Sequence, residues 1–161
     1  ATDIVHSSNS AKLQNDLGTL LLDEAMKMTD PVQQQAQLQE ALPHLRRAVE
    51  LHPTYYDAML AYGACAYYGK QYDVASASYR QALRLYPGDS KSAAGLFYSL
   101  QALAPDQWSK QDSAAAVRTL EEAYRLQPDT TTAARLSEYY RAMGLSQQSM
   151  DWDDKAHGDI R

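Results

Sequence analysis

The sequence is poor in cysteine, the residue that forms disulfides and binds metal ions as thiolate. Cys65 is the single cysteine among 161 residues, so no disulfide can form within the chain and no multi-cysteine metal site can exist. Glycine and proline are also few, at 7 and 6 residues, and 45% of the residues are hydrophobic. This composition is typical of a folded chain and not of a disordered one. The composition does not decide whether the chain is cytoplasmic or extracytoplasmic.

Positive charge and long apolar runs are scarce as well. The 15 Lys and Arg residues are outnumbered by 20 Asp and Glu, which gives a formal net charge of -5 at pH 7. Nucleic-acid backbones and anionic membrane surfaces select for clustered Lys and Arg, so we expect no nucleic-acid partner. The longest apolar candidate, residues 17–28, contains three charged residues, whereas a membrane helix needs roughly 20 apolar ones. We therefore expect no direct membrane insertion of this segment.

Motifs that carry chemistry are missing too. The sequence has no phosphate-binding loop, no nucleophile elbow and no zinc motif. Asp153 and His157 are four residues apart and share one face of a helix, but two ligands do not complete a metal site. Cys65 lies between two alanines, and we interpret it as a buried packing residue. We expect no enzyme activity, no catalytic residue, no cofactor and no metal.

What the sequence does contain is repetition. Three segments end alike, in Leu, one variable residue and Pro: ALPHLRRAVELHP, ASASYRQALRLYP and AAAVRTLEEAYRLQP. The three prolines, Pro53, Pro87 and Pro128, are 34 and 41 residues apart. A period of 34 residues is typical of helix pairs that stack on one another.

Residues 56–89 resemble the tetratricopeptide repeat, a pair of antiparallel helices with a Leu-Gly step on the first and an Ala, aromatic, Ala, Pro series on the second. The matching residues are Met59, Tyr62, Gly63, Ala66, Tyr67, Ala75, Tyr79, Ala82 and Pro87. The resemblance implies an all-α, right-handed superhelical solenoid of about eight helices in antiparallel pairs. No strand pattern competes with it.

The resemblance also sets the expected boundaries. Residues 1–9 are a polar lead-in, residues 10–157 form a single solenoid domain, and residues 158–161 are a tail. The units cover residues 10–53, 54–87, 88–128 and 129–157. The first unit carries 11 extra residues around the break at residues 29–31, and the third carries 7 within residues 102–112. The fourth lacks the alanines of a second helix, so we interpret it as a degenerate capping unit.

Local signals predict how these helices begin, end and cross. Asp30 before a proline is typical of an N-cap, and hydroxyl caps are expected at Thr54, Ser90, Ser113 and one of the threonines at 130–132. Gly69 and Gly144 are expected to end first helices in the left-handed conformation. Gly63 is expected to meet Ala75 where two helices cross, and Pro43 should kink the helix that contains it.

In similar repeats, side chains one or two steps off the packing positions of each first helix point into a concave groove. By register, the resemblance implies these groove residues: Lys12, Asn15, Thr19, Asp57, Leu60, Ala64, Tyr67, Tyr68, Lys91, Ala94, Tyr98, Gln101, Thr131, Ala134, Glu138 and Arg141. Such a mixed wall suits a protein or peptide segment with apolar anchors. Tyr62, Tyr72 and Tyr79 are expected in the core instead.

The chain departs from the variant of this family that clamps chaperone tails, because only Lys91 has the right chemistry at a clamp position. We therefore expect a noncatalytic protein-binding or peptide-binding scaffold, either a monomer or a weak homo-oligomer. The alternative is a repeat region excised from a larger bacterial protein, membrane-anchored or glycosyltransferase-like, where it mediates assembly or self-association. The residues do not identify the partner or the pathway.

Overall fold

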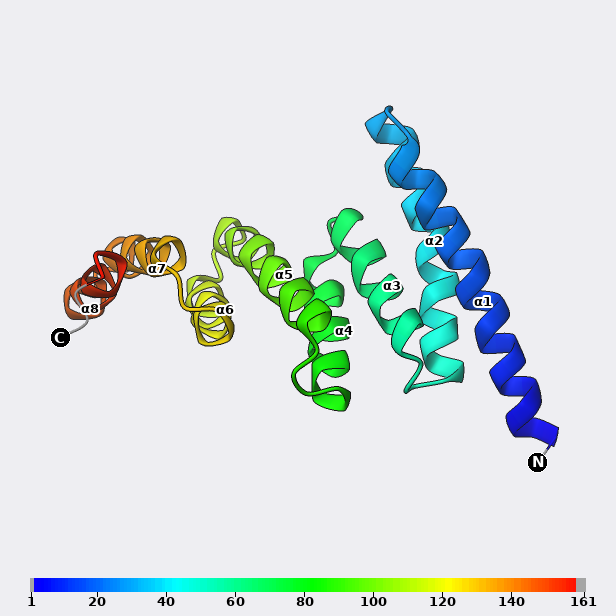
Figure 1. Cartoon of the computed structure of the whole chain (residues 1–161). Coiled ribbons are helices and arrows are strands. Elements are labelled where there is room, and N and C mark those ends of the chain that lie inside the picture. The colour runs from blue at the N-terminus through cyan, green and yellow to red at the C-terminus, as the bar shows by residue number, and fades with distance from the viewer. Residues whose placement is uncertain (1, 159–161) are drawn as a thin grey trace. The chain divides into compact units, whose positions relative to one another are not determined.

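The structure is a computed structural model. In the part of the chain that it describes, all regular secondary structure is helical. That part is residues 2–158, without the side chains of residues 2 and 5. It contains eight α-helices and no strand (Figure 1). The helices are α1 (Thr2–Lys27), α2 (Pro31–Leu51), α3 (Tyr56–Tyr68), α4 (Tyr72–Leu85), α5 (Ser90–Ser109), α6 (Ser113–Leu126), α7 (Thr130–Ala142) and α8 (Ser146–Ala156). The predicted all-α class and helix number are confirmed, and all but the first residue of the predicted tail lies outside the described residues.

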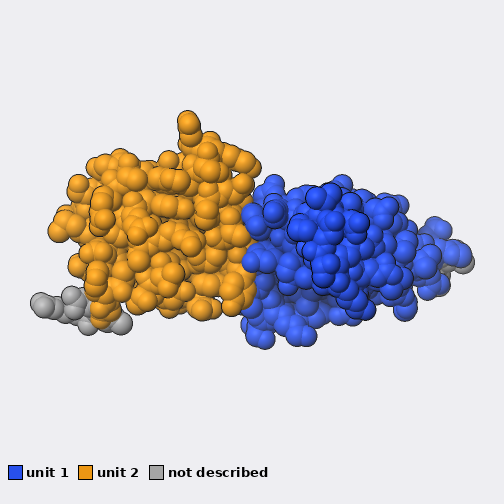
Figure 2. All heavy atoms as spheres, turned by 90° about the horizontal axis from the view of Figure 1, so that it is seen from above, with its two compact units in different colours: residues 1–96 blue, residues 97–161 orange. Residues whose placement is uncertain are grey.

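The contacts within the chain divide it into two compact units, residues 1–96 and 97–161, which Figure 2 shows in blue and orange. Unit 1 contains α1 to α4 and the beginning of α5. Unit 2 contains the rest of α5 and α6 to α8. The single solenoid domain over residues 10–157 stays a prediction.

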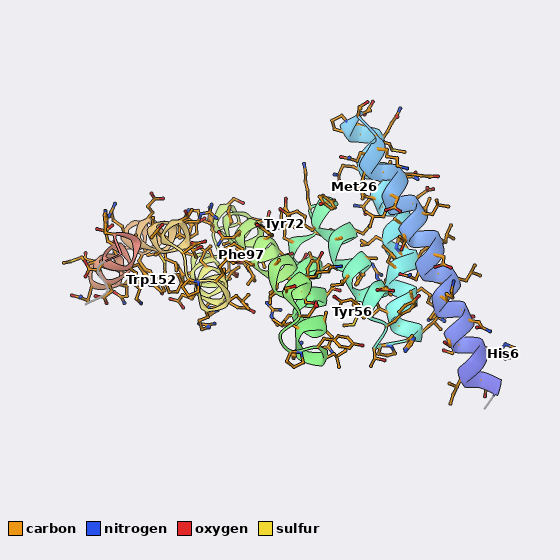
Figure 3. The ribbon with its side chains drawn as sticks, viewed as in Figure 1. His6, Met26, Tyr56, Tyr72, Phe97 and Trp152 are labelled. Atoms are coloured by element: carbon orange, nitrogen blue, oxygen red, sulfur yellow. The ribbon has the colours of Figure 1, made fainter. Side chains whose placement is uncertain are left out.

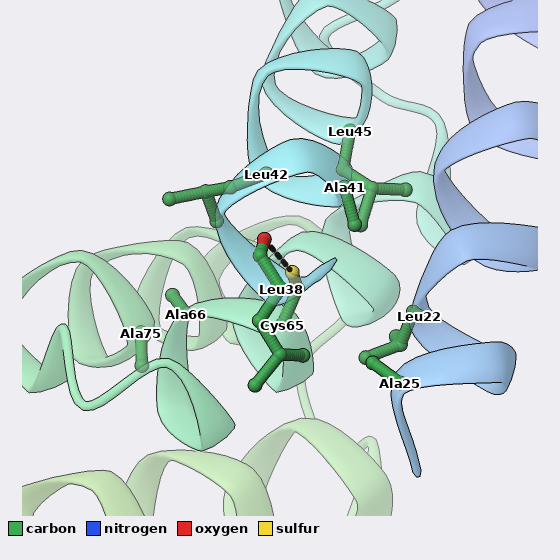
Figure 4. Packing of buried hydrophobic residues seen from close by; sticks show 9 residues of the cluster. All are labelled: Leu22, Ala25, Leu38, Ala41, Leu42, Leu45, Cys65, Ala66 and Ala75. Carbon is green, nitrogen blue, oxygen red and sulfur yellow. Dashed lines mark hydrogen bonds between the residues drawn. The ribbon is translucent and has the colours of Figure 1, made fainter. Parts of the chain in front are cut away.

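In unit 1, α2 lies between α1 and α3 and supplies the centre of the core (Figure 4). Leu38 and Leu45 of α2 are 1% and 0% exposed, and Leu22 of α1 and Cys65 of α3 pack against the same cluster. The Cys65 thiol donates to the backbone oxygen of Leu38 over 3.4 Å. Burial raises its pKa to about 11, so it is a packing residue, as the sequence predicts.

A large ring covers two glycines in unit 1. The ring of Tyr79 lies against Gly63, and a Cβ built on Gly63 would lie 2.8 Å from Cε2 of that ring. The same ring also covers Gly95 at the beginning of α5. Tyr79 is 9% exposed, which confirms its predicted place in the core. Ala75 is buried in the core cluster of unit 1, and its predicted contact with Gly63 stays a prediction.

Three of the turns within helix pairs share one geometry. Lys70, Gln111 and Gly144 have φ angles of 62°, 63° and 77°, in the left-handed region. In each turn the next residue donates its amide to the carbonyl five residues before it, over 2.8 to 3.0 Å. The prediction for Gly144 is confirmed, whereas that for Gly69 is wrong, because Gly69 has φ -78° and Lys70 adopts the left-handed conformation.

Aspartates, and not hydroxyl residues, cap four of the described helices: α2, α5, α6 and α7. Asp30 accepts from the amides of Val32 and Gln33, which confirms the predicted cap of α2. The hydroxyl caps predicted at Thr54, Ser90, Ser113 and residues 130–132 are wrong. Asp112 and Asp129 cap α6 and α7, Asp89 accepts from the amide of Ser92 at the start of α5, and α3 has no side-chain cap. A carboxylate also suits the positive end of a helix dipole, which a hydroxyl does not.

The extra residues of the first and third units lengthen helices and do not form loops. Helices α1, α2 and α5 contain 26, 21 and 20 residues, compared with 11 to 14 in the others. The residues predicted as a polar lead-in, 1–9, are helical from Thr2 onward, and the Ser7 hydroxyl donates to the backbone oxygen of Leu51 over 3.2 Å. Polar sequence alone did not reveal this first turn, because it is held through its contact with the end of α2.

Candidate partner-binding surface

The predicted groove residues of α1 divide into two exposed or half-buried side chains and one that is buried. Lys12 is exposed and forms an ion pair with Asp16 over 2.7 Å, and this hydrogen bond raises the pKa of Lys12. Thr19 is half-buried. Asn15 is only 8% exposed, and its amide nitrogen donates to the hydroxyl of Tyr55, the residue before α3, over 3.4 Å. The structure therefore corrects the placement of Asn15 on an open surface.

In α3, Tyr68 is the aromatic side chain that the structure leaves most open. It is 45% exposed, whereas Leu60, Ala64 and Tyr67 are half-buried and Asp57 is exposed. The Tyr67 ring lies edge-on to those of Tyr68 and Tyr72, at centroid distances of 5.4 and 5.8 Å. Ala64 and Tyr67 also pack against the core cluster of unit 1. Of the two tyrosines, Tyr68 thus has the more accessible ring, and the ring of Tyr67 packs between it and the core.

The predicted residues of α5 lie in both units. Lys91 and Ala94 are exposed in unit 1. In unit 2, Tyr98 is 59% exposed and its ring lies edge-on to that of Phe97. Gln101 is half-buried and already bonded, since its side-chain nitrogen donates to the Thr132 hydroxyl over 2.6 Å. Gln101 therefore holds α5 and α7 together and has little freedom to contact a partner.

A proline explains why Gln101 is tied to α7. Pro105 lies inside α5 and has no amide hydrogen, so the backbone oxygen four residues earlier, on Gln101, receives no helical hydrogen bond. The guanidinium of Arg135 replaces that bond, because its Nη1 donates to both oxygens of Gln101 over 3.1 Å. Sequence reasoning missed Arg135, and the signal that could have found it is the proline inside a helix.

In unit 2, three of the four predicted residues of α7 line one hollow. Thr131, Ala134 and Glu138 surround a volume of about 480 Å³ together with Thr130 and Arg135, and with Asp153, Ala156 and His157 of α8. Arg141 is exposed and does not line it. The hollow carries charges of both signs beside two small apolar side chains, a combination that can hold a polar chain and orient it.

The pair considered as metal ligands lies in this hollow. His157 Nδ1 is 2.8 Å from the backbone oxygen of Asp153 and 3.8 Å from its carboxylate Oδ1. Among residues 2–158, no group of three or more His, Cys, Asp or Glu side chains is placed to hold a metal ion.

A second hollow, of about 570 Å³, lies in unit 1 and was missed by sequence reasoning. The first turns of α1 and the end of α2 line it, through Asp3, Ile4, Ser7, Ser8, Leu51 and His52. It could not be anticipated because these first residues were assigned to a lead-in. Ile4, 76% exposed, is followed by Val5 in an otherwise polar stretch, and these apolar residues are the sequence signal for a surface there.

None of the described helices combines the length and the apolar character that crossing a bilayer requires.

Comparisons with known proteins agree with this architecture. Residues 33–90 match the family model of the tetratricopeptide repeat. Two solved structures of MamA are each 15% identical to the chain with a TM-score of 0.54; both alignments cover 92% of this chain, and they cover 77% and 72% of theirs. A structure of YrrB, titled as a TPR protein with an unusual peptide-binding site, is 18% identical over 78% of this chain and 61% of its own, with a TM-score of 0.47. No curated protein sequence matches the chain.

Paired helices joined by short turns, with glycine at the crossings, define an all-α helix-pair repeat protein. Residues 33–90 thus contain the tetratricopeptide repeat, and the chain shares the helix-pair fold of the MamA structures.

Proposed function

We propose that the chain is a noncatalytic scaffold that binds a protein or peptide segment on the exposed faces of its first helices. The observation that carries this proposal is the exposure of the predicted first-helix residues. All of them except Asn15 are exposed or half-buried, and they include two large aromatic side chains, Tyr68 and Tyr98, at 45% and 59% exposure. An exposed tyrosine offers a rigid apolar surface with a polar tip, which is why tyrosine is common among residues that dominate binding energy.

The surroundings of these residues support a peptide better than a small molecule. The hollow beside α7 is open and carries Arg135, Glu138 and Asp153, which can orient a polar backbone or side chain. Small-molecule sites are mostly apolar and enclose their ligand. The net charge of -5 further favours a partner segment that is neutral or basic.

The test selects peptides from a displayed random library on the 161-residue chain and measures their affinities by fluorescence polarisation. Tyr68→Ala and Tyr98→Ala, made separately, are each expected to weaken peptides that bind the tyrosine's own unit about 5-fold to 30-fold, because truncating a central aromatic anchor costs about 1 to 2 kcal/mol. Val32→Ala is the matched control, since Val32 is 78% exposed but lies on a second helix. Its affinity should stay within about twofold, as a surface residue outside the contact contributes little.

Two outcomes contradict the proposal. One is that the selection yields no peptide that binds. The other is that selected peptides bind both tyrosine variants, and variants at Lys91 and Glu138, as tightly as the unaltered chain, while circular dichroism shows intact helices. In that case the binding surface lies elsewhere on the molecule.

A further inference from the structure

Helix α1 has apolar side chains on two opposite faces, although only one of them meets the rest of unit 1. Ala11, Leu22 and Ala25 are buried on the face toward α2. Leu13, Leu17 and Leu20 are on the other side and remain 68%, 39% and 55% exposed. A helix at the surface of a globular unit normally has a single apolar stripe, so the second one indicates a further contact.

The exposed leucines belong to a longer series with the spacing of a coiled coil. We call it the outer stripe; it advances by alternating steps of three and four residues and consists of Asp3, His6, Ser10, Leu13, Leu17, Leu20, Glu24 and Lys27. Every one of these eight residues is exposed. Figure 3 shows His6 on the side of α1 that points away from α2. A repeat of 3.5 residues keeps such a seam directed at one partner helix along its whole length.

We propose that the outer stripe pairs two copies of this chain, with α1 of one packed antiparallel against α1 of the other. In a two-fold antiparallel pair, the sum of facing residue numbers is constant, so placing Leu13 against the second copy's Leu17 fixes every other contact. Leu20 then faces Ser10, Glu24 faces His6, and Lys27 faces Asp3. Each contact occurs twice, once on either side of the axis.

Charge complementarity is the reason for choosing a second copy as the occupant. In this register both charged ends of the stripe meet groups that they attract: the ammonium of Lys27 meets the carboxylate of Asp3, and Glu24 meets the imidazole of His6. Glu24 is exposed, and its Oε2 accepts a hydrogen bond from Gln37 of α2 over 3.0 Å, so the contact with His6 uses its other carboxylate oxygen. The neighbouring register, which places Leu17 against Leu20, also makes two leucine contacts. It sets Leu13 against the carboxylate of Glu24 and Lys27 against Ser10, so it loses the contacts of Lys27 with Asp3 and of Glu24 with His6.

The pairing is a weak one. A stable interface buries about 800 Å² on each partner, and three leucines at the centre of one helix supply only part of that apolar area. Two copies with a net charge of -5 each also repel at long range. The dimer should therefore form reversibly with rising protein concentration. None of the stripe residues is a predicted groove residue, so this inference does not depend on the proposed function.

The first experiment is sedimentation equilibrium on the 161-residue chain over a wide concentration range. The average mass is expected to rise from that of the monomer toward that of the dimer. The double variant Leu13→Glu, Leu17→Glu should weaken association at least tenfold, whereas Val32→Glu, an equally exposed apolar residue on α2, should leave it within twofold. Circular dichroism checks that the helices persist. A constant monomer mass for the unaltered chain overturns the proposal, and so does a dimer that the leucine variant leaves intact.

A second experiment tests the antiparallel register by exchanging charges. Lys27→Glu and Asp3→Lys, each alone, place like charges opposite each other in both symmetric contacts, so each variant should self-associate less than the unaltered chain. In an equimolar mixture, the two variants should form mixed dimers, because every altered residue then faces one of opposite charge. A mixture that associates no better than its components overturns this arrangement even if the leucine variant abolishes the dimer.

Discussion

At the residue scale, two turns contain a residue other than glycine in the left-handed backbone conformation, which glycine adopts with less strain. Lys70 and Gln111 adopt φ angles of 62° and 63°, a conformation that costs a residue with Cβ about 1 to 2 kcal/mol. Gly144 occupies the matching position of the last pair without that cost. The turns at Lys70 and Gln111 therefore carry backbone strain that the turn at Gly144 does not.

We predict that Lys70→Gly and Gln111→Gly each stabilise the fold. The relieved strain exceeds the extra entropy that glycine loses on folding, about 0.5 to 1 kcal/mol, so the free energy of unfolding should rise by up to about 1 kcal/mol. Urea titration followed by circular dichroism measures the change. Lys70→Ala is the matched control, because alanine keeps the strained φ and removes the same side chain. An equal rise in that variant would show that the lysine side chain, and not the φ angle, is responsible.

The crossing of α3 and α4 gives a second prediction at this scale. Gly63→Leu should destabilise unit 1 by about 1 to 3 kcal/mol or more, since the new side chain must enter the space filled by the Tyr79 ring. The double variant with Tyr79→Ala should lose less than the sum of the single changes, because the ring is then gone. Additive losses in the urea titrations would mean that Gly63 and Tyr79 do not restrict each other.

At the element scale, α5 continues through Pro105 because another helix supplies the missing hydrogen bond. Arg135→Met should destabilise the chain by about 1 to 3 kcal/mol, since it leaves the backbone oxygen of Gln101 without a donor. In a Pro105→Ala background, the restored amide at position 105 can bond that oxygen, so the same arginine substitution should cost less. The coupling energy from this double-mutant cycle is the measurement, and a value near zero would contradict the account.

Sequence patterns predicted the ends of the helices well where nearby residues determine them, and less well where a residue distant in the sequence does. The break before Pro31, the Asp30 cap and the left-handed Gly144 follow from nearby residues. The length of α5 does not follow from nearby residues, because a proline such as Pro105 normally ends a helix. Here Arg135 of α7 bonds the backbone oxygen that the proline leaves without a donor. The same holds for the first residues of α1, which depend on a contact with the end of α2.

At the scale of the whole molecule, the two units carry separate natural probes. Cys65, the single cysteine, lies in unit 1, and both tryptophans, Trp108 and Trp152, lie in unit 2. The Cys65 thiol is buried, and its pKa of about 11 keeps it protonated at pH 8, so a thiol reagent should modify it only when unit 1 opens. Trp108 stacks on Tyr139 at a centroid distance of 4.2 Å, so fluorescence should report the loss of unit 2.

We predict that unit 2 unfolds at a lower urea concentration than unit 1. Its last helix, α8, has Ser149 as its one buried residue, whereas α2 in unit 1 buries five residues. The stability of a repeat protein is approximately a sum over neighbouring repeats, so a poorly buried end should be lost first. Tryptophan fluorescence and Cys65 labelling across the titration give the two midpoints. Coincident midpoints would contradict the prediction and indicate a single cooperative transition.

The exposure of the first-helix residues followed from the sequence only in part, and partner binding on them stays a prediction. Register along the repeat identified Tyr68, Tyr98 and Glu138 as surface residues. It could not show that Asn15 is covered by Tyr55 or that Gln101 is bonded to Arg135, because both contacts join residues more than 30 positions apart.

The position of the Tyr79 ring between Gly63 and Gly95 also limits the order in which this protein can change over evolution. Either glycine can gain a side chain only if the ring has first become smaller, because the ring fills the space beside both of them. A smaller residue at position 79 leaves a cavity until one of the glycines is replaced, and that intermediate is itself less stable. Descendants of this chain should therefore keep all three residues or replace them together.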